Sequence, residues 1–436
     1  MTISESCPPK KRKVLIITSS GGGGLLQAAN AKEQELRAKD PHVVIIRRDV
    51  MKDWMRMKLG KVFISLWNRA QLQGNVWVQS FFAAIAPFVE IFFRPPIFFF
   101  SLYTLFKEDI DQVIDTQVMG TSAILKALRF FNRRKKKQVH LEKVLVDLPT
   151  KKATHFFVPI RSLSEKDRKW FRLITVAPLL EEGQTEEEFW KQNCNLTFQN
   201  IQYEDYYVRQ SFLRYRHLAR KAETALLRTR YQSREELSSI EKSVSRGAVQ
   251  FTVKDRELLF SISPESRVFT LLLGSQPANH ATLNYVKKFI ELSEELQENQ
   301  YPVYLFVFCS YYTPDPSSLF QKVTDYVHQH RHNSLLTIVP MSFQDDDVIA
   351  PLFFRSDMTC TRSGGQTAME LLSVSQGEIW IHSEAKKTAD PITNDELLKG
   401  IPGWESANAS YLQHRRNAKI VTPDTFVPLA RKLMSK

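Results

Sequence analysis

The fold is decided by the stretch Cys360-Thr361-Arg362-Ser363-Gly364-Gly365-Gln366-Thr367-Ala368-Met369-Glu370. Its two glycines stand where an apolar segment gives way to a helical pattern. Gly364 and Gly365 leave room for a ligand, and the first amides of the helix can bind an anion such as a diphosphate. Glu370 follows about one turn later, where its carboxylate can accept hydrogen bonds from ribose hydroxyls. The stretch indicates nucleotide binding by an α/β domain.

Alternating strands and helices surround this stretch. Strands are expected at 268–273, 303–308 and 335–339, and helices at 283–297, 319–328 and from 367 to 372. A second set begins near the N-terminus, where the strand 14–17 leads into Gly21, Gly22, Gly23 and Gly24 and a helix at 25–39. Further strands of this set are expected at 43–46, 112–114, 144–146 and 156–159.

These two sets predict an α/β fold of two Rossmann-like domains facing a cleft. A seam with serine and proline at 261–266 places the N-terminal domain at 1–262 and the C-terminal domain at 263–436. Between 181 and 257 the chain is charged and mostly helical in pattern, which predicts a helical insertion. The helix expected at 424–434 closes the chain.

Composition narrows the class of partner. The 436 residues carry a formal charge of +13 and a pI of about 9.4, so an anionic partner is expected: a nucleotide, a phospholipid surface or nucleic acid. Nucleic acid is disfavoured because aromatic residues do not alternate with the basic runs 10–13 and 133–137. The four cysteines form no CxxC pair, and no secretory signal precedes the first strand, which favours the cytoplasm. Residues 8–14 match a nuclear-import signal, but a basic flank of the first strand explains them better.

The most apolar stretch, 76–106, is interrupted too often to span a bilayer. Arg94-Pro95-Pro96 is expected to break it. Two interpretations stay open: a buried helix pair, or a surface that enters a lipid interface beside the basic run 133–137.

The glycine stretch resembles the nucleotide-sugar signature of the GT-B glycosyltransferase family that contains bacterial lipid II synthase (the MurG type) and plant monogalactosyldiacylglycerol synthase. That signature is Ser/Thr-Arg-x-Gly-x-x-Thr-x-x-Glu. Its positions are occupied by Thr361, Arg362, Gly364, Thr367 and Glu370. The resemblance covers the first strand–turn–helix and most of 268–426, and it is weak across 50–260.

The resemblance implies a site for the nucleotide-sugar donor, with UDP-sugars favoured. The family's next motif resembles the segment from Trp404 to Ala409, in which Glu405 and Asn408 take the positions that contact the donor sugar. The implied donor site comprises Arg362, Ser363, Gly364, Gly365, Gln366, Thr367, Glu370, Glu405 and Asn408. No cofactor and no metal are expected: His328, His330 and His332 fit a solvated helix end, and Asp345-Asp346-Asp347 fits a helix cap.

The chain departs from the family where the first glycine loop usually ends in a histidine, because Gly24 stands there. If a residue takes the acceptor's proton, it lies elsewhere. Asp147 and His155 are the candidates, in a segment that resembles the Thr-Asp-Leu…His segment of galactolipid synthases. The alternatives are a turn cap for Asp147 and a packing role for His155.

The expected function is inverting transfer of a sugar from a nucleotide-sugar to a lipid or membrane-associated acceptor. Transfer to a protein or another soluble acceptor stays open. So does nucleotide-sugar binding without transfer, which Gly24 suggests, and an epimerase on the same fold is a further alternative.

Overall fold

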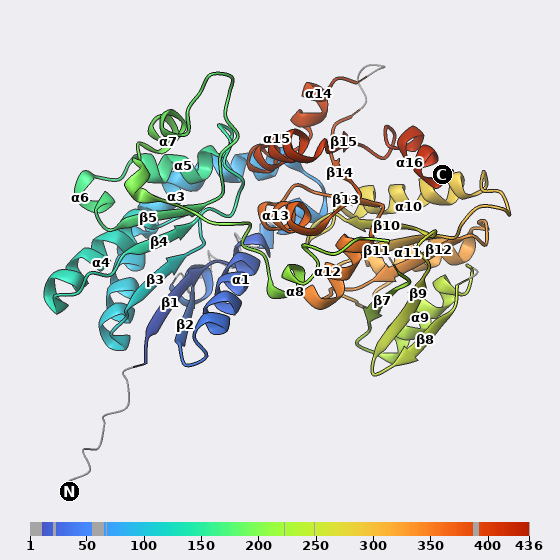
Figure 1. Cartoon of the computed structure of the whole chain (residues 1–436), viewed down its shortest axis with the longest axis horizontal. Coiled ribbons are helices and arrows are strands. Elements are labelled where there is room, and N and C mark those ends of the chain that lie inside the picture. Colours follow the sequence, from blue (N-terminus) through green and yellow to red (C-terminus); the bar gives the residue numbers. More distant parts are fainter. Residues whose placement is uncertain are drawn as a thin grey trace, which may run out of the picture. The chain divides into compact units, whose positions relative to one another are not determined.

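The computed structural model describes residues 11–20, 23–54, 65–66, 68–221, 223–247, 249–386 and 392–435, without the side chains of 80, 82–84 and 86–89. The chain divides into two compact units. The first comprises Met1–Val62, Ile85–Val146 and Thr154–Tyr207; the second comprises Phe63–Ala84, Asp147–Ala153 and Val208–Lys436. Figure 1 follows the chain from the blue N-terminus to the red C-terminus.

The first unit is built on a six-stranded parallel sheet in the order β2-β1-β3-β4-β5-β6. Its strands are β1 (Lys13–Thr18), β2 (Val44–Asp49), β3 (Gln112–Asp115), β4 (Leu141–Val144), β5 (Phe171–Thr175) and β6 (Ile201–Tyr203). Its helical segments are α1 (Gly23–Lys39), η1 (Val50–Trp54), α4 (Thr121–Lys135), α5 (Thr154–Arg161), α6 (Glu165–Arg168), α7 (Glu186–Cys194) and η2 (Phe198–Asn200), together with part of α3 (Val76–Glu108).

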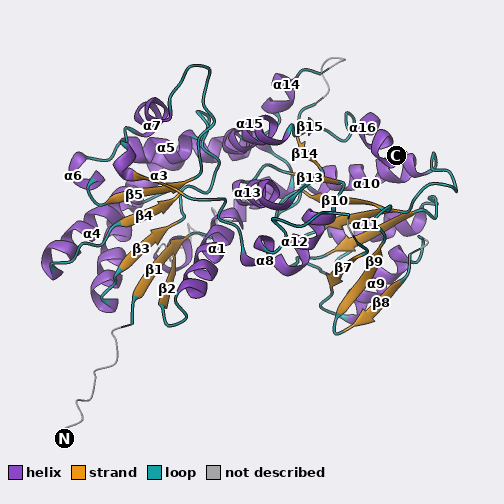
Figure 2. Cartoon of the chain, viewed as in Figure 1, coloured by secondary structure: helices purple, strands orange, loops and turns teal. Residues whose placement is uncertain are grey.

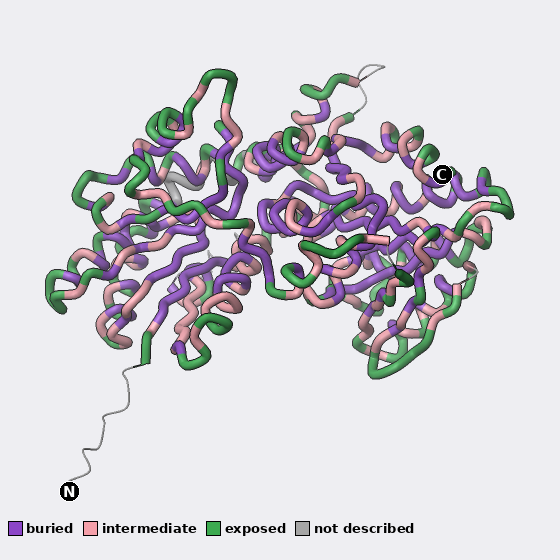
Figure 3. Tube along the Cα trace, in the orientation of Figure 1, coloured by how far each residue is buried: buried purple, intermediate pink, exposed green. Residues whose placement is uncertain are grey.

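Connectivity sets the layers of this unit. The chain moves from β1 to β2 in one direction and from β2 through β3 to β6 in the other. Right-handed crossovers therefore place α1 on one face of the sheet and α3, α4, α5 and α7 on the opposite face. The central strands are buried, as Figure 3 shows in purple.

The second unit repeats this design with a parallel sheet in the order β12-β11-β10-β13-β14-β15. Its strands are β10 (Arg267–Leu272), β11 (Val303–Phe308), β12 (Leu336–Met341), β13 (Met358–Thr361), β14 (Glu378–His382) and β15 (Lys419–Val421). Its helices are α10 (Asn279–Ser293), α11 (Leu319–Gln329), α12 (Asp346–Arg355), α13 (Gly365–Val374), α14 (Asn394–Lys399), α15 (Gly403–Arg416) and α16 (Val427–Met434). The predicted α/β fold class with two Rossmann-like domains is confirmed.

The stretch 181–257 differs from the predicted helical insertion, as Figure 2 shows by element type. Besides α7 it contains β6, which completes the first sheet, and α8 (Gln210–Leu213). It then forms a small antiparallel sheet in the order β7-β9-β8, flanked by α9; the bounds are β7 (Ala225–Arg230), α9 (Arg234–Val244), β8 (Phe251–Lys254) and β9 (Glu257–Ile262). Because β7 packs on α12 and α9 packs on β12, the contacts assign this sheet to the second unit. The units thus divide at Tyr207, upstream of the predicted boundary at 262.

One predicted strand of the first unit is wrong. The run 156–159 belongs to helix α5, which buries Phe156, Phe157 and Ile160. These residues follow helical spacing, so the aromatic and β-branched composition misled the strand prediction. The strand expected at 144–146 exists as β4, but it begins earlier and ends at Val144.

The apolar stretch forms one continuous helix, α3, instead of the predicted broken segment. Pro95 and Pro96 cannot donate the bonds that Ile91 and Phe92 would accept in a regular helix. Those two residues are 58% and 65% exposed, so water can satisfy their carbonyls. Within the part of the chain that the structure describes, no helix is long and apolar enough to cross a membrane.

Candidate functional site

The candidate site lies where the second sheet reverses the direction of its connections. From β10 the chain leads through α10 to β11 on one side, and from β13 through α13 to β14 on the other. Leu272 and Thr361 are paired at the carboxyl ends of these neighbouring strands. In open α/β sheets ligands bind outside the carboxyl ends of the strands at such a switch point. The two loops that leave the strands here contain Gly274 and the predicted glycine pair.

The N-terminus of α13 is open at this point. Gly364 is the N-cap, no side chain caps the helix, and no acidic residue occupies its first turn. A Cβ added to Gly364 would meet no heavy atom of the described chain within 4 Å. The exposed partial positive charge of the helix start therefore meets free space, as anion binding requires.

Glu370 lies in the same helix, 2% exposed, and an arginine holds it in place. Arg209 Nε donates to Glu370 Oε1 at 2.8 Å and Arg209 Nη2 donates to Oε2 at 3.0 Å. Gln366 Nε2 also donates to Oε1, at 3.2 Å. Burial by itself would lower the pKa of Arg209, but the charge of Glu370 outweighs it and raises that pKa. A carboxylate has about four acceptor positions, so these bonds leave capacity at Oε2 for a ligand hydroxyl.

A second buried ion pair joins the glycine loop to α15. Arg362 Nη2 lies 3.1 Å from Glu405 Oε2, and the same nitrogen donates to Gln79 Oε1 of α3 at 3.1 Å. Gly274 has a φ of 88°, and a Cβ built there would come within 4.0 Å of Arg362 Cδ. That distance is ordinary van der Waals contact, so the positive φ, and not a lack of space, favours glycine in this loop.

Asn408 connects the predicted donor site to the predicted base. Its Nδ2 donates to Asp147 Oδ1 at 2.7 Å and to the Ser363 carbonyl at 2.8 Å, and its Oδ1 accepts from the Leu148 amide at 2.7 Å. All these bonds lie within the second unit. They occupy both amide hydrogens of Asn408, which therefore connects Asp147 to the glycine loop.

The glycine loop of the first unit is only partly described. Gly21 and Gly22 lie outside the described residues, and α1 begins at Gly23. Among the atoms of the described residues, a Cβ on Gly24 would meet only Val146 Cγ1, at 3.8 Å, which leaves room there for a larger residue. His155 is on α5, half-buried with its ring 4.8 Å from that of Phe156. It belongs to the first unit, whereas Asp147 is grouped with the second.

The predicted donor residues mostly come together, but sequence reasoning missed three neighbours. None of the three belongs to a recognisable motif. Arg209 lies in a basic stretch, Gln79 in an apolar helix and Gly274 in an ordinary strand-to-helix turn. Gly274 follows a buried strand, and that position was the one available clue. The partners of Glu370 and Arg362 could be found only from the folded chain.

The acidic and histidine clusters have other roles. Asp345 is the N-cap of α12 but makes no capping bond with its side chain. Asp347 instead pairs with Arg228 and Arg230 of β7, at 2.8 Å for Arg228. His330 stacks on Tyr326, and burial lowers the pKa of His332. Among the described residues, no three His, Cys, Asp or Glu side chains are arranged to hold a metal ion.

No protein-family model and no curated protein matches this sequence. The chain is similar to solved structures of nucleotide-sugar enzymes, glycosyltransferases among them. MurG from Acinetobacter baumannii is 14% identical with a TM-score of 0.44, over 97% of this chain and 92% of that one. A putative UDP-N-acetylglucosamine 2-epimerase from Listeria monocytogenes is 10% identical with a TM-score of 0.47, over 98% and 89%. The calicheamicin glycosyltransferase CalG4 is 10% identical with a TM-score of 0.45, over 98% and 89%. At these identities and TM-scores the function has to be argued from the site itself.

Proposed function

We propose that this protein is a GT-B glycosyltransferase that takes a sugar from a nucleotide-sugar donor, with UDP-sugars favoured. One observation carries the proposal: an uncapped, glycine-lined helix start stands at the switch point of the second sheet, with a buried carboxylate about one turn inside the same helix. The helix start fits a diphosphate and the carboxylate fits a ribose diol. The residues also match the family signature at Thr361, Arg362, Gly364, Thr367 and Glu370.

Catalysis is assigned to Asp147, with His155 as the second candidate. Inverting transfer needs one group that accepts the acceptor's proton as the new bond forms. The amide of Asn408 holds the Asp147 carboxylate at 2.7 Å, so its orientation is fixed before an acceptor arrives. A preoriented base loses little freedom in the transition state.

A lipid or membrane-associated acceptor is supported by α3. Phe92, Phe99 and Tyr103 are 65%, 65% and 62% exposed and lie along one side of the helix, while Phe93 and Ile97 pack inward on the other. Lys107 lies over the Tyr103 ring and Arg134 over Phe130, at 5.5 and 5.3 Å. Exposed aromatic rings flanked by cations suit the interface of an anionic membrane.

Lys137 is no free member of this basic surface. Its ammonium pairs with Asp109 and Asp111 and donates to the carbonyls of Asp109 and Ile110. It therefore secures the end of α3. Lys135 also pairs with Asp109, at 3.9 Å, so the cations left for a membrane in this run are the exposed residues Arg133, Arg134 and Lys136.

The second candidate function is nucleotide-sugar binding without transfer, which Gly24 favours because it offers no imidazole at the start of α1. Calorimetric titration with UDP-, GDP- and dTDP-sugars, followed by an assay of donor hydrolysis, separates the two. Binding and slow hydrolysis of a UDP-sugar support the transferase. Binding without turnover favours the second candidate, and a C2-epimerised sugar would assign the site to an epimerase. Absence of nucleotide binding would refute both candidates.

A further inference from the structure

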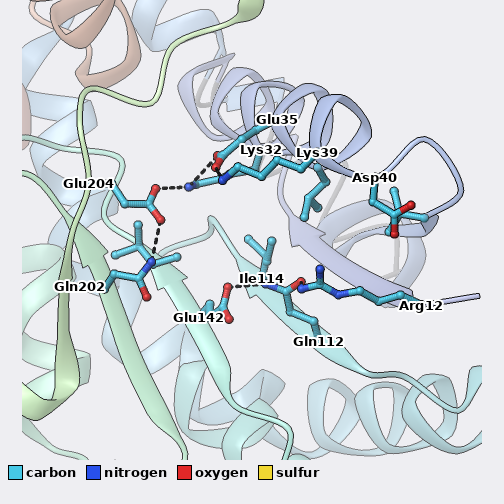
Figure 4. Close-up of a pocket in the computed structure, with 13 residues that line it drawn as sticks. Arg12, Lys32, Glu35, Lys39, Asp40, Gln112, Ile114, Glu142, Gln202 and Glu204 are labelled. Carbon is cyan, nitrogen blue, oxygen red and sulfur yellow. Dashed lines mark hydrogen bonds and ion pairs between the residues drawn. The ribbon is translucent and has the colours of Figure 1, made fainter.

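Outside the candidate nucleotide site, charged side chains mostly meet partners of opposite charge. The cavity of about 250 Å³ in the first unit is an example (Figure 4). There Lys32 pairs with both Glu35 and Glu204, and Glu142 accepts a hydrogen bond from Gln112 at 2.6 Å. A cluster at the amino ends of β10 and β13 in the second unit is different, because its charges do not match.

Four cations of this cluster gather around the carboxylate of Asp357, which directly precedes β13. The nearest is Lys221, whose Nζ lies 2.8 Å from Asp357 Oδ1. Arg220 Nη2 and Arg267 Nη1 lie 3.5 and 3.6 Å from the same oxygen, and Arg355 Nη1 lies 3.3 Å from Oδ2. No other Asp or Glu of the described residues forms an ion pair with these cations. Four positive charges against one negative charge leave an excess of three.

Arg355 is the structural member of the cluster. It is fully buried, and its Nη2 donates to the carbonyls of Ser263 at 2.8 Å and Ser266 at 2.9 Å. Arg355 thereby holds the turn before β10 against the start of β13. The side chains of Arg220, Lys221 and Arg267 are between 20% and 24% exposed. These three cations therefore form the face of the cluster that a ligand can reach.

The accessible cations have more hydrogen-bond donors than the chain has acceptors for them. Arg220 Nη1 donates to the Ser356 carbonyl at 2.8 Å, but its Nη2 and the Nη1 of Arg267 are too far from Asp357 for hydrogen bonds. Arg267 is the extreme case: within the described chain its side chain donates no hydrogen bond, and its Nε is buried without a partner. A guanidinium has five N–H donors, so this arginine has unused capacity for a ligand.

The electrostatics of the cluster favour a second anion. Burial lowers the pKa of Lys221 and of Arg220, the charge of Asp357 offsets this only in part, and the charge of Arg267 lowers both pKa values further. Burial would raise the pKa of Asp357, but the hydrogen bond from Lys221 keeps it below its usual value. The carboxylate is therefore already ionised and cannot supply more negative charge. An added anion would stabilise the charged forms of all three accessible cations.

We propose that Arg220, Lys221 and Arg267 bind a phosphate group. A phosphate has at least three terminal oxygens in a tetrahedral arrangement, so it can accept hydrogen bonds from three separate cations, whereas a carboxylate offers two oxygens in one plane. The planar fork of an arginine also matches two oxygens of a phosphate. The cluster lies at the amino ends of the strands and the candidate nucleotide site at their carboxyl ends, so the proposal does not depend on sugar transfer.

The test is calorimetric titration of the full-length protein with sodium phosphate at constant ionic strength, with sodium acetate as the comparison anion. We expect saturable binding of phosphate that acetate does not reproduce. Arg267→Met should weaken phosphate binding by roughly tenfold or more, the effect of losing one charge-assisted hydrogen bond. Because Arg267 donates no hydrogen bond within the described chain, its loss should not lower the melting temperature in phosphate-free buffer. Glycerol 3-phosphate distinguishes the source: binding as tight as that of free phosphate assigns the site to phosphate esters, and much weaker binding assigns it to free phosphate.

The matched control is Arg431→Met, which removes an arginine of the second unit that pairs with Glu295 outside the cluster. This variant should bind phosphate as tightly as the wild type does. If Arg267→Met does not fold, Lys221→Gln is the second variant, since Asp357 keeps its contacts with Arg355 and with the Val268 amide. Phosphate bound at the start of α13 would respond to neither variant, so the comparison isolates the cluster. Equal phosphate binding by the wild type and a folded cluster variant, or wild-type binding of phosphate no tighter than that of acetate, overturns the proposal.

Discussion

The buried pair Arg209–Glu370 gives the sharpest quantitative prediction. The two side chains are 8% and 3% exposed and meet through two hydrogen bonds. Removing one partner of a buried pair typically costs about 3–5 kcal/mol, because the other charge is left without compensation. We therefore expect Arg209→Met to lower the free energy of unfolding by about that amount. The double variant Arg209→Met/Glu370→Met should recover most of the loss, because it leaves no buried charge.

Urea denaturation of the wild type, both single variants and the double variant measures this coupling. Arg431→Met is the matched control, because Arg431 forms the same two-bond geometry with Glu295 but both side chains are about half exposed. Exposed pairs contribute little, so this variant should leave the midpoint nearly unchanged. If Arg209→Met costs no more than Arg431→Met, Arg209 does not hold a buried charge on Glu370 and the reasoning fails.

Four further predictions follow from particular contacts. Asn408→Ala should destabilise the second unit by about 3 kcal/mol or more, since three buried polar groups lose a partner at about 1–3 kcal/mol each; thermal denaturation that matches wild type would contradict this. Gly24→Ala should stabilise the first unit by about 0.4–1 kcal/mol, because the helix has room for a Cβ. A melting temperature below that of the wild type would contradict this prediction. Burial raises the pKa of Glu142, so the stability of the wild type should fall as the pH rises from the unfolded pKa of 4.5 through the raised folded pKa. Glu142→Gln should lack this fall and be the more stable protein at neutral pH. Parallel curves of stability against pH for the two proteins would refute the prediction. Arg133→Gln/Arg134→Gln/Lys136→Gln should weaken co-sedimentation with anionic vesicles and leave the melting temperature unchanged, with zwitterionic vesicles as the control. If the wild type does not bind anionic vesicles, the acceptor should be sought among soluble molecules.

The sequence predicts the two sheets well because their strands are short apolar runs bounded by clear turns. The strand at 303–308 coincides with β11, and the glycine loop at 364 and 365 opens α13 as expected. Failures occur where a local pattern has two solutions. Phe156 and Phe157 suit a strand or a helix by composition, and only their packing in α5 decides. Pro95 and Pro96 normally end a helix, but here the residues whose carbonyls lose a donor, Ile91 and Phe92, are on the exposed side of α3, where water can bond to them.

The motif of the candidate site can be predicted from the sequence, but the hydrogen-bond partners of its residues cannot. Glu370 can be singled out from its place about one turn inside the helix, and Asn408 from the resemblance to the family's second motif. Their bonds to Arg209 and Asp147 join residues 161 and 261 positions apart. A local sequence pattern cannot predict contacts between residues so far apart in the chain. The structure adds a contact to Asn408 that the sequence did not predict, its hydrogen bond to Asp147.

The central claim is that the second unit binds a nucleoside diphosphate through the start of α13, with the ribose diol on Glu370. Its most direct test is calorimetric titration of the wild-type protein with UDP and with 2′,3′-dideoxy-UDP, which differ only in the two hydroxyls. A hydrogen bond to a charged group is worth about 1.5–3 kcal/mol, so we expect UDP to bind roughly ten- to a hundredfold more tightly. Equal affinities for the two nucleotides would contradict the assignment of Glu370, and no binding of either would contradict the nucleotide site itself.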